Sequence, residues 1–112
     1  MGGNSMTEMS GADLIAAERQ RQVNSEGYTP EHDAEHGPQQ LALAAIAYAI
    51  PRGGLMEPAW WPLRFWPWQI HEFKPSDDRV RDLTKAGALI AAAIDAEQSR
   101  QQRAERKKAS EQ

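Results

Sequence analysis

Five of the chain's seven prolines fall between residues 51 and 75, and they divide the sequence into parts that must fold differently. Proline lacks the amide N–H and fixes its own φ angle, so regular helices and central strands do not tolerate this density. We therefore expect a long irregular connection there, of a length that is often functional. Six large rings accompany the prolines: Trp60, Trp61, Phe65, Trp66, Trp68 and Phe73.

Helical patterns flank this Trp/Pro-rich segment on both sides. Before it, a first helix is predicted over residues 12–24, where Ser10 followed by Asp13 resembles a capping box. A second helix is predicted over residues 39–50, with Pro38 in its first turn. Since the second helix is apolar nearly all round, we expect it to be the buried one.

A third helix, over residues 79–97, has the clearest start and the clearest periodicity. Ser76 is expected to cap it, and Gly87, between two alanines, is expected to mark a close crossing with the second helix. Apolar residues at three- and four-residue spacing predict the face turned to the core. They are Val80, Leu83, Gly87, Ile90 and Ile94.

At 112 residues the chain has room for one hydrophobic core. The predicted fold class is all-α: a small three-helix bundle with the long Trp/Pro-rich segment packed across it. We expect residues 1–10 to be a disordered start or a cloning scar and residues 11–97 to be the helical domain. Residues 98–112 are wholly polar in pattern and are expected to form a helical extension or a disordered tail.

Composition excludes several classes of function. The chain has no cysteine, which rules out disulfides, thiolate zinc sites and cysteine nucleophiles. Its net charge of −3 gives no general reason to expect DNA or an anionic membrane as partner. No apolar run reaches the roughly 18–20 residues of a membrane span, and the first residues do not resemble a signal peptide. We therefore expect a cytoplasmic protein.

One segment, residues 31–36, has the residue types of a metal site. His32 and His36 are four residues apart and would share a helical face, where Asp33 could complete a ligand set. Pro30 and Gly37 bracket the segment, however, and leave it barely a turn and a half. The simpler interpretation is a polar loop that caps the second helix, so no metal or other cofactor is predicted.

The Trp/Pro-rich segment has two interpretations. Most of its rings are expected to supply the volume that alanine-rich helices lack. One or two more could line a pocket, where an aromatic face stacks on a nucleobase for roughly 1–3 kcal/mol. Nearby Arg52, Arg64 and Lys74 are suited to bind phosphate.

The polar run at residues 18–22 also has two interpretations. The first is a solvated helix face; in the second, Arg19 or Arg21 points into a site formed with residues 26–36. Catalytic motifs have little support, because the chain lacks both a Gly-x-Ser-x-Gly turn and a glycine-rich phosphate loop. Acid–base chemistry by a carboxylate and a histidine stays open. The sequence favours a binding protein over an enzyme.

Three blocks of sequence resemble a family of short phage and prophage proteins. They are Glu-Arg-Gln-Arg-Gln at residues 18–22, Glu-Gly-Tyr-Thr-Pro-Glu-His-Asp-Ala-Glu-His at 26–36 and Lys-Ala-Gly-Ala-Leu-Ile at 85–90. The family usually has Trp where this chain has Tyr28 and a second Asp where it has Ala34. This resemblance covers residues 12–97 and implies little about activity.

Two looser similarities point to nucleotides. The order of blocks is similar to the ryanodine-receptor-repeat (RyR) domain, which would give Tyr28, Asp33 and His36 a place in a site for nucleotide-derived signals. The opening stretch is also similar to MazG-like nucleotide pyrophosphohydrolases. Those enzymes hold magnesium with a Glu-x-x-Glu motif on the next helix, whereas residues 41–50 contain no acid. This departure argues against the hydrolase.

Our leading hypothesis is therefore a non-enzymatic, phage-type binding protein that captures a small nucleotide-derived ligand, such as a host defence signal. We expect it to form a dimer through its second or third helix, with no membrane and no sequence-specific nucleic acid as partner. The ligand-binding residues that we expect are Arg19, Arg21, Tyr28, His32, Asp33, His36, Trp60, Trp61, Arg64, Trp66, Trp68 and Lys74.

Two alternatives remain open. One is a protein-interaction module that docks through the Trp/Pro-rich segment. The other is a metal-dependent, MazG-like nucleotide hydrolase that uses Glu31, His32, Asp33 and His36.

Overall fold

A computed structural model describes residues 9–26, 37–51 and 61–111. The described chain is all-α, as predicted. Its three α-helices are α2 (Gly11–Glu26), α4 (Pro38–Ala49) and α5 (Arg79–Ser110), and the Trp/Pro-rich segment adds two short 3₁₀ helices, η1 (Trp61–Arg64) and η2 (Ile70–Glu72). Prolines fit this arrangement, because a single 3₁₀ turn needs few backbone bonds.

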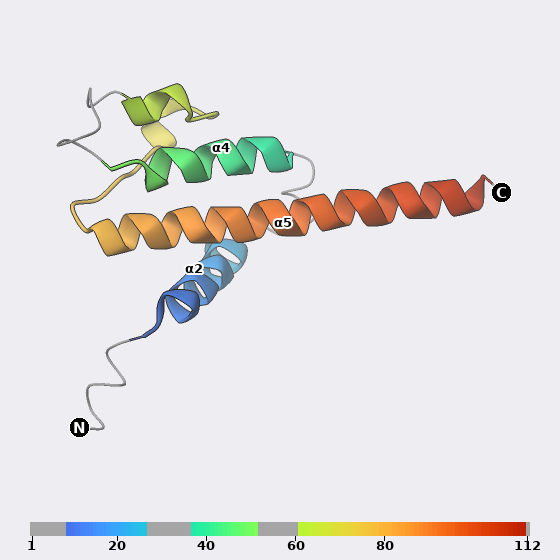
Figure 1. The fold of residues 1–112 in the computed structure, drawn as a ribbon, viewed down its shortest axis with the longest axis horizontal. Coiled ribbons are helices and arrows are strands. Elements are labelled where there is room, and N and C mark those ends of the chain that lie inside the picture. The colour runs from blue at the N-terminus through green and yellow to red at the C-terminus, as the bar shows by residue number, and fades with distance from the viewer. Residues whose placement is uncertain (1–8, 27–36, 52–60, 112) are drawn as a thin grey trace.

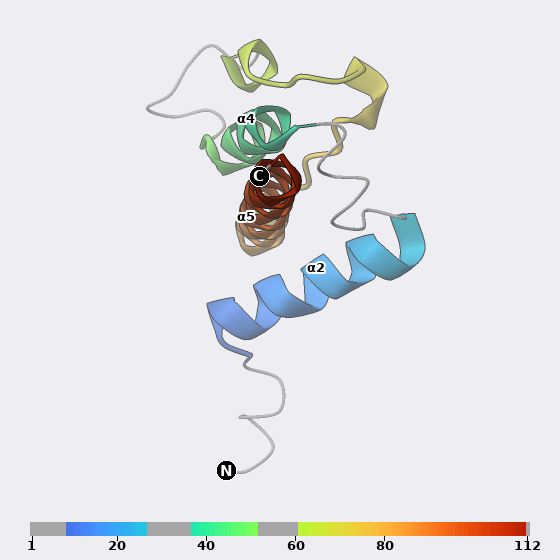
Figure 2. The same ribbon diagram turned by 90° about the vertical axis from the view of Figure 1, so that its right-hand side faces the viewer.

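The long helix α5 is the axis of the molecule (Figure 1). Helix α4 lies along the first half of α5, and α2 crosses α5 on another side. The segment that carries η1 and η2 covers the side of α4 that faces away from α5 (Figure 2). This confirms a three-helix fold, with the described part of the Trp/Pro-rich segment packed across one of the helices.

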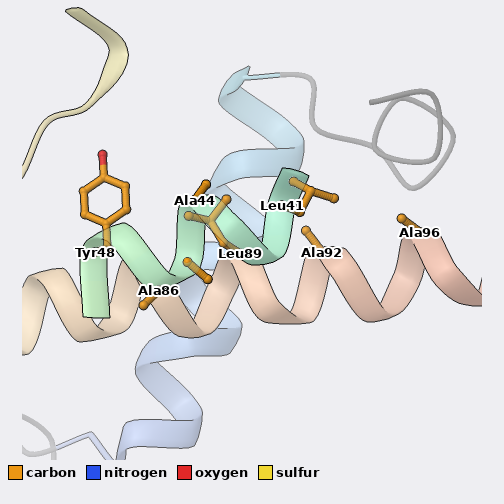
Figure 3. Packing of buried hydrophobic residues seen from close by; sticks show 8 residues of the cluster. Leu41, Ala44, Tyr48, Ala86, Leu89, Ala92 and Ala96 are labelled. Carbon is orange, nitrogen blue, oxygen red and sulfur yellow. The ribbon is translucent and has the colours of Figure 1, made fainter. Parts of the chain in front are cut away.

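Alanine dominates the contact between α4 and α5. Ala44 and Ala45 of α4 are almost fully buried. Leu41 of α4 and Leu89 of α5 belong to the same cluster, and Leu89 lies beside Ala44 (Figure 3). The α5 side of this contact is Ala86, Leu89, Ala92 and Ala96. Small side chains let two helix backbones approach closely, and this close approach gives a thin but dense core.

The predicted core-facing stripe of α5 is wrong. Val80, Leu83, Ile90 and Ile94 are 58 %, 45 %, 44 % and 54 % exposed. The alanine face of α5, on the α4 side, is buried instead. The spacing of the large apolar residues predicts the wrong face of α5. The helices α4 and α5 meet through facing rows of alanine, which let them approach more closely than branched side chains would.

The predicted partner of Gly87 is also wrong, although a close crossing does occur there. A methyl group on Gly87 would lie 2.4 Å from Cδ1 of Ile15, so the glycine makes room for α2 and not for α4. The sequence signals a close approach at this position, but it does not identify which helix approaches.

Side-chain caps begin both α5 and α2. Asp78, and not Ser76, caps α5: its carboxylate accepts from the backbone N–H groups of Val80 and Arg81. Ser76 supports the cap, because its hydroxyl oxygen accepts from the Asp78 N–H. At α2 the Ser10 half of the predicted capping box is confirmed, as the Asp13 N–H donates to Ser10 Oγ at 3.1 Å.

Helix α5 does not end near residue 97 but continues to Ser110. Its 32 residues correspond to a length of about 48 Å, and its last turns extend beyond α4 and α2 (Figure 1). The side chains from Arg100 to Glu111 are exposed. Of the two predictions for this segment, the helical extension is the one that the structure shows.

Two neighbouring residues test which face of α5 holds the core. Leu89→Ala should lower the free energy of unfolding by about 2–5 kcal/mol, because it leaves a cavity against α4. Ile90→Ala should cost less than about 1 kcal/mol, because that side chain is 44 % exposed. Urea unfolding measures both. Equal losses, or a larger loss at Ile90, would mean that the predicted stripe is buried after all.

Candidate ligand-binding cavity

A cavity of about 640 Å³ lies where α2, α4, α5 and the Trp/Pro-rich segment meet. This volume falls in the range of known sites for small molecules. The described residues that line it are Glu18, Arg21, Gln22, Tyr48, Trp66, Trp68, His71, Glu72, Lys74, Arg81, Lys85 and Leu89.

One wall of the cavity is aromatic. Tyr48 and Trp66 meet edge to face, with ring centroids 5.6 Å apart. Trp66 and Trp68 meet in the same way at 5.2 Å. Phe73 packs behind them, 4.9 Å from Tyr48 and 5.0 Å from Trp66. The half-buried rings Trp66, Trp68 and Phe73 also contact the alanine core, so the same cluster supports the fold and forms part of the cavity wall.

Hydrogen bonds fix these rings in place. The indole N–H of Trp66 donates to the Gln69 carbonyl at 2.8 Å. The indole N–H of Trp68 donates to Gln40 Oε1 on α4 at 3.0 Å. The Tyr48 hydroxyl accepts from the backbone N–H of Lys74 at 2.9 Å, which ties the end of the Trp/Pro-rich segment to α4. The aromatic wall is thus held before any ligand enters.

The polar wall of the cavity is built around Glu18, a residue that is 4 % exposed. Arg21 binds both of its oxygens from the next turn of α2, at 3.0 and 2.9 Å. Arg81 reaches the same carboxylate from α5 at 2.7 Å. One buried anion therefore joins two helices and holds two guanidinium groups at the edge of the cavity.

These contacts set the ionisation of Glu18. Burial alone would raise the pKa of this carboxyl, but hydrogen bonds from Arg21 and Arg81, and the charges of both, outweigh it. The pKa of Glu18 falls from 4.5 to about 2. At neutral pH the group is an anion that offsets one of the two neighbouring positive charges.

Lys85 places a positive charge beside the aromatic wall. Its ammonium donates to the backbone carbonyl of Lys74 at 2.7 Å and lies 5.3 Å from the centre of the Tyr48 ring. Burial lowers the pKa of Lys85, and the charge of Arg81 lowers it further. Within the described residues, no carboxylate lies within 4.0 Å of this ammonium, so its charge is not neutralised by direct contact.

Four of the predicted ligand-binding residues line this cavity: Arg21, Trp66, Trp68 and Lys74. Arg19 points elsewhere, into an ion pair with Asp95 at 3.2 Å beside a separate apolar groove between α2 and α5. Arg64 is exposed in η1, apart from the described lining. Trp61 begins η1, but its side chain is outside the described part. The same holds for the whole of Tyr28, His32, Asp33, His36 and Trp60.

Sequence reasoning missed several lining residues, and Glu18 and Gln22 most clearly. The first interpretation of residues 18–22 places both on a solvated face, yet they are 4 % and 5 % exposed. A signal was available, since Ile15, Glu18 and Gln22 follow the i, i+3, i+7 spacing of one helix face. Polar residues in line with an apolar one can mark a buried polar contact. Lys85 and Leu89 are another such pair, a polar and an apolar residue one turn apart on the same face of α5.

A metal site and a membrane-spanning helix are two further possibilities for the described part of the chain. No three His, Asp or Glu side chains there lie close enough together to hold a metal ion. The residues of the metal hypothesis, Glu31 to His36, lie outside the described ranges. None of the described helices combines the length and the apolar character needed to cross a membrane.

Comparisons of the chain with protein-family models, with curated proteins and with solved structures found no match. The function is therefore inferred from the residues that line the cavity and from their chemistry.

Glu18→Gln tests the polar wall. The amide cannot carry the charge that Arg21 and Arg81 bind, so the free energy of unfolding at pH 7 should fall by about 1.5–3 kcal/mol. Because the folded pKa is lower than the unfolded one, the wild-type advantage is full above pH 4.5 and disappears as the pH falls towards 2.

Urea unfolding between pH 2.5 and 7 measures this difference, with Glu105→Gln on the exposed end of α5 as the matched control. The control should stay within about 0.5 kcal/mol of wild type at every pH. A Glu18→Gln loss that does not change with pH would show that the ion pairs are not its cause.

Proposed function

We propose that the chain is a binding protein for a small nucleotide-derived anion, held in the cavity between the aromatic wall and the Glu18–Arg21–Arg81 cluster. The observation that carries this proposal is Lys85, a cation that lies beside the Tyr48 ring and has no carboxylate in direct contact among the described residues. A phosphate supplies the missing negative charge, and a nucleobase supplies an apolar face for the rings.

The charge of the lining supports an anionic ligand. Arg21, Lys74, Arg81 and Lys85 face two carboxylates, Glu18 and Glu72, so the lining is positive while the whole chain has a net charge of −3. Only Nη1 of Arg81 binds Glu18 in the described contacts, which leaves its other N–H donors for a phosphate. The Glu18 carboxylate keeps the arginines from repelling each other before the ligand arrives.

The resemblance to phage proteins adds a second line of support. Two of the three blocks on which it rests, residues 18–22 and 85–90, both contribute side chains to the cavity. If those blocks share a function in the family, this cavity is where their chemistry meets. Capture of a host signalling nucleotide in the host cytoplasm is the role that we propose on this basis.

The alternative, a protein-interaction module, would use aliphatic side chains of the Trp/Pro-rich segment and not its tryptophans. Trp66 and Trp68 pack against the core, whereas Ile70 and Leu63 of the same segment are 71 % and 37 % exposed. A docking partner would therefore meet these aliphatic side chains. The expected dimer stays a prediction, and the open face of α5 with Leu83 and Ile90 is the surface that we assign to it.

Isothermal titration calorimetry with ATP, ADP-ribose and cyclic di-AMP tests the binding function. Lys85→Met keeps the aliphatic stem but removes the charge. It should weaken phosphate-dependent binding about 10–100-fold, the equivalent of one charge-assisted hydrogen bond. Thermal unfolding in parallel checks that the variant remains folded.

Lys107→Met, on the exposed end of α5, is the matched control and should bind like wild type. No heat with any of the three probes, together with an unchanged melting temperature in their presence, would remove the proposal. Equal weakening by the two substitutions would mean attraction by overall charge and would place the ligand outside this cavity.

A further inference from the structure

Gln22 is 5 % exposed and belongs to the lining of the cavity, yet one of its side-chain polar atoms has no hydrogen-bond partner among the described residues. Its amide nitrogen lies 3.4 Å from Glu18 Oε2 and donates to it. This contact assigns the two ends of the amide, because a carboxylate accepts only from the nitrogen. Gln22 Oε1 is then a buried acceptor with no donor among the described residues.

Such an acceptor is unusual in a folded protein, where nearly all buried polar groups are paired. The 3.4 Å bond to Glu18 is longer than an ordinary hydrogen bond, so it holds the amide only loosely. The terminal torsion of a glutamine side chain has a broad energy profile. The oxygen can therefore turn towards a donor that enters the cavity at little cost.

The neighbours of Gln22 indicate which part of a nucleotide would supply that donor. Gln22 shares the Glu18 carboxylate with Arg21 and Arg81, so it belongs to the guanidinium wall and not to the aromatic one. In the proposed function the phosphate binds at this wall and the base at the rings. A donor beside the phosphate of a nucleotide is a sugar hydroxyl, since the base is a full sugar ring away.

We infer that Gln22 is a specificity-determining residue that accepts a hydrogen bond from a ribose hydroxyl, so that the cavity selects ribonucleotides over deoxyribonucleotides. This inference rests on the proposed function. A site that pairs a buried group with a ligand hydroxyl rejects the analogue without it, because the group is then left unsatisfied. The selectivity belongs to the sugar and is independent of which base stacks on the rings.

The test compares ATP with 2′-deoxy-ATP, 3′-deoxy-ATP and 2′,3′-dideoxy-ATP by calorimetry on the full chain. Wild type should bind ATP at least about 10-fold more tightly than the dideoxy form. The two single-deoxy forms show which hydroxyl is used. In Gln22→Met, which has similar length but no acceptor, ATP and the dideoxy form should bind equally.

Gln20→Met is the matched control, because Gln20 lies on the same helix but is exposed and bonded to Asn24. It should keep the wild-type preference.

Equal binding of ATP and dideoxy-ATP to wild type would overturn the role of Gln22 and leave the proposed function standing. A ribose preference that survives in Gln22→Met would also overturn it. No binding of any of these nucleotides would remove this inference, and the three-probe titration then decides the proposed function separately.

Discussion

The carboxylate of Glu18 is the contact on which the arrangement of this molecule depends. Helix α2 brings little apolar surface to α5: Ile15 packs over Gly87, and the next two turns of the same face are polar. Glu18 compensates by binding Arg81 across the gap and Arg21 within its own helix. A buried charge is unfavourable unless it is paired, so this carboxylate specifies one position of α2 relative to α5. The polar wall of the cavity follows directly from that position.

The rest of the cavity follows from the small side chains of the core. Alanine-lined helices α4 and α5 pack closely but bury little volume, and the ring cluster of the Trp/Pro-rich segment supplies what they lack. Arg79 strengthens this unit by donating to the carbonyls of Tyr48, in the last turn of α4, and of the C-cap residue Ile50, where the helix dipole favours a cation. Tyr48 then connects the core to the cavity, because its ring packs with Trp66 and its hydroxyl binds Lys74.

Local signals predicted the elements of this fold, and long-range contacts decided the rest. Proline density, the Ser10 cap and the apolar run of α4 are properties of neighbouring residues, so the all-α class and the irregular segment could be read from sequence. The buried face of α5 could not, because the choice between Leu83 and Leu89 depends on where α4 lies. The burial of Glu18 could not be predicted for the same reason, because its partner Arg81 is 63 residues away in the sequence. Aromatic and basic residues did indicate a pocket, but the sequence could not show that Arg19 and Arg21, two positions apart, turn to opposite sides of α2.

The pKa of Glu18 is the most direct test of this account, because the hydrogen bonds and charges of Arg21 and Arg81 lower it against the effect of burial. An NMR titration that follows the side-chain carboxyl carbon of Glu18 in the folded chain measures it without any ligand. The structure gives a midpoint at about pH 2. A midpoint at or above the ordinary value of 4.5 would mean that burial prevails and the arginines lie elsewhere, in which case neither the position of α2 nor the polar wall of the cavity would stand.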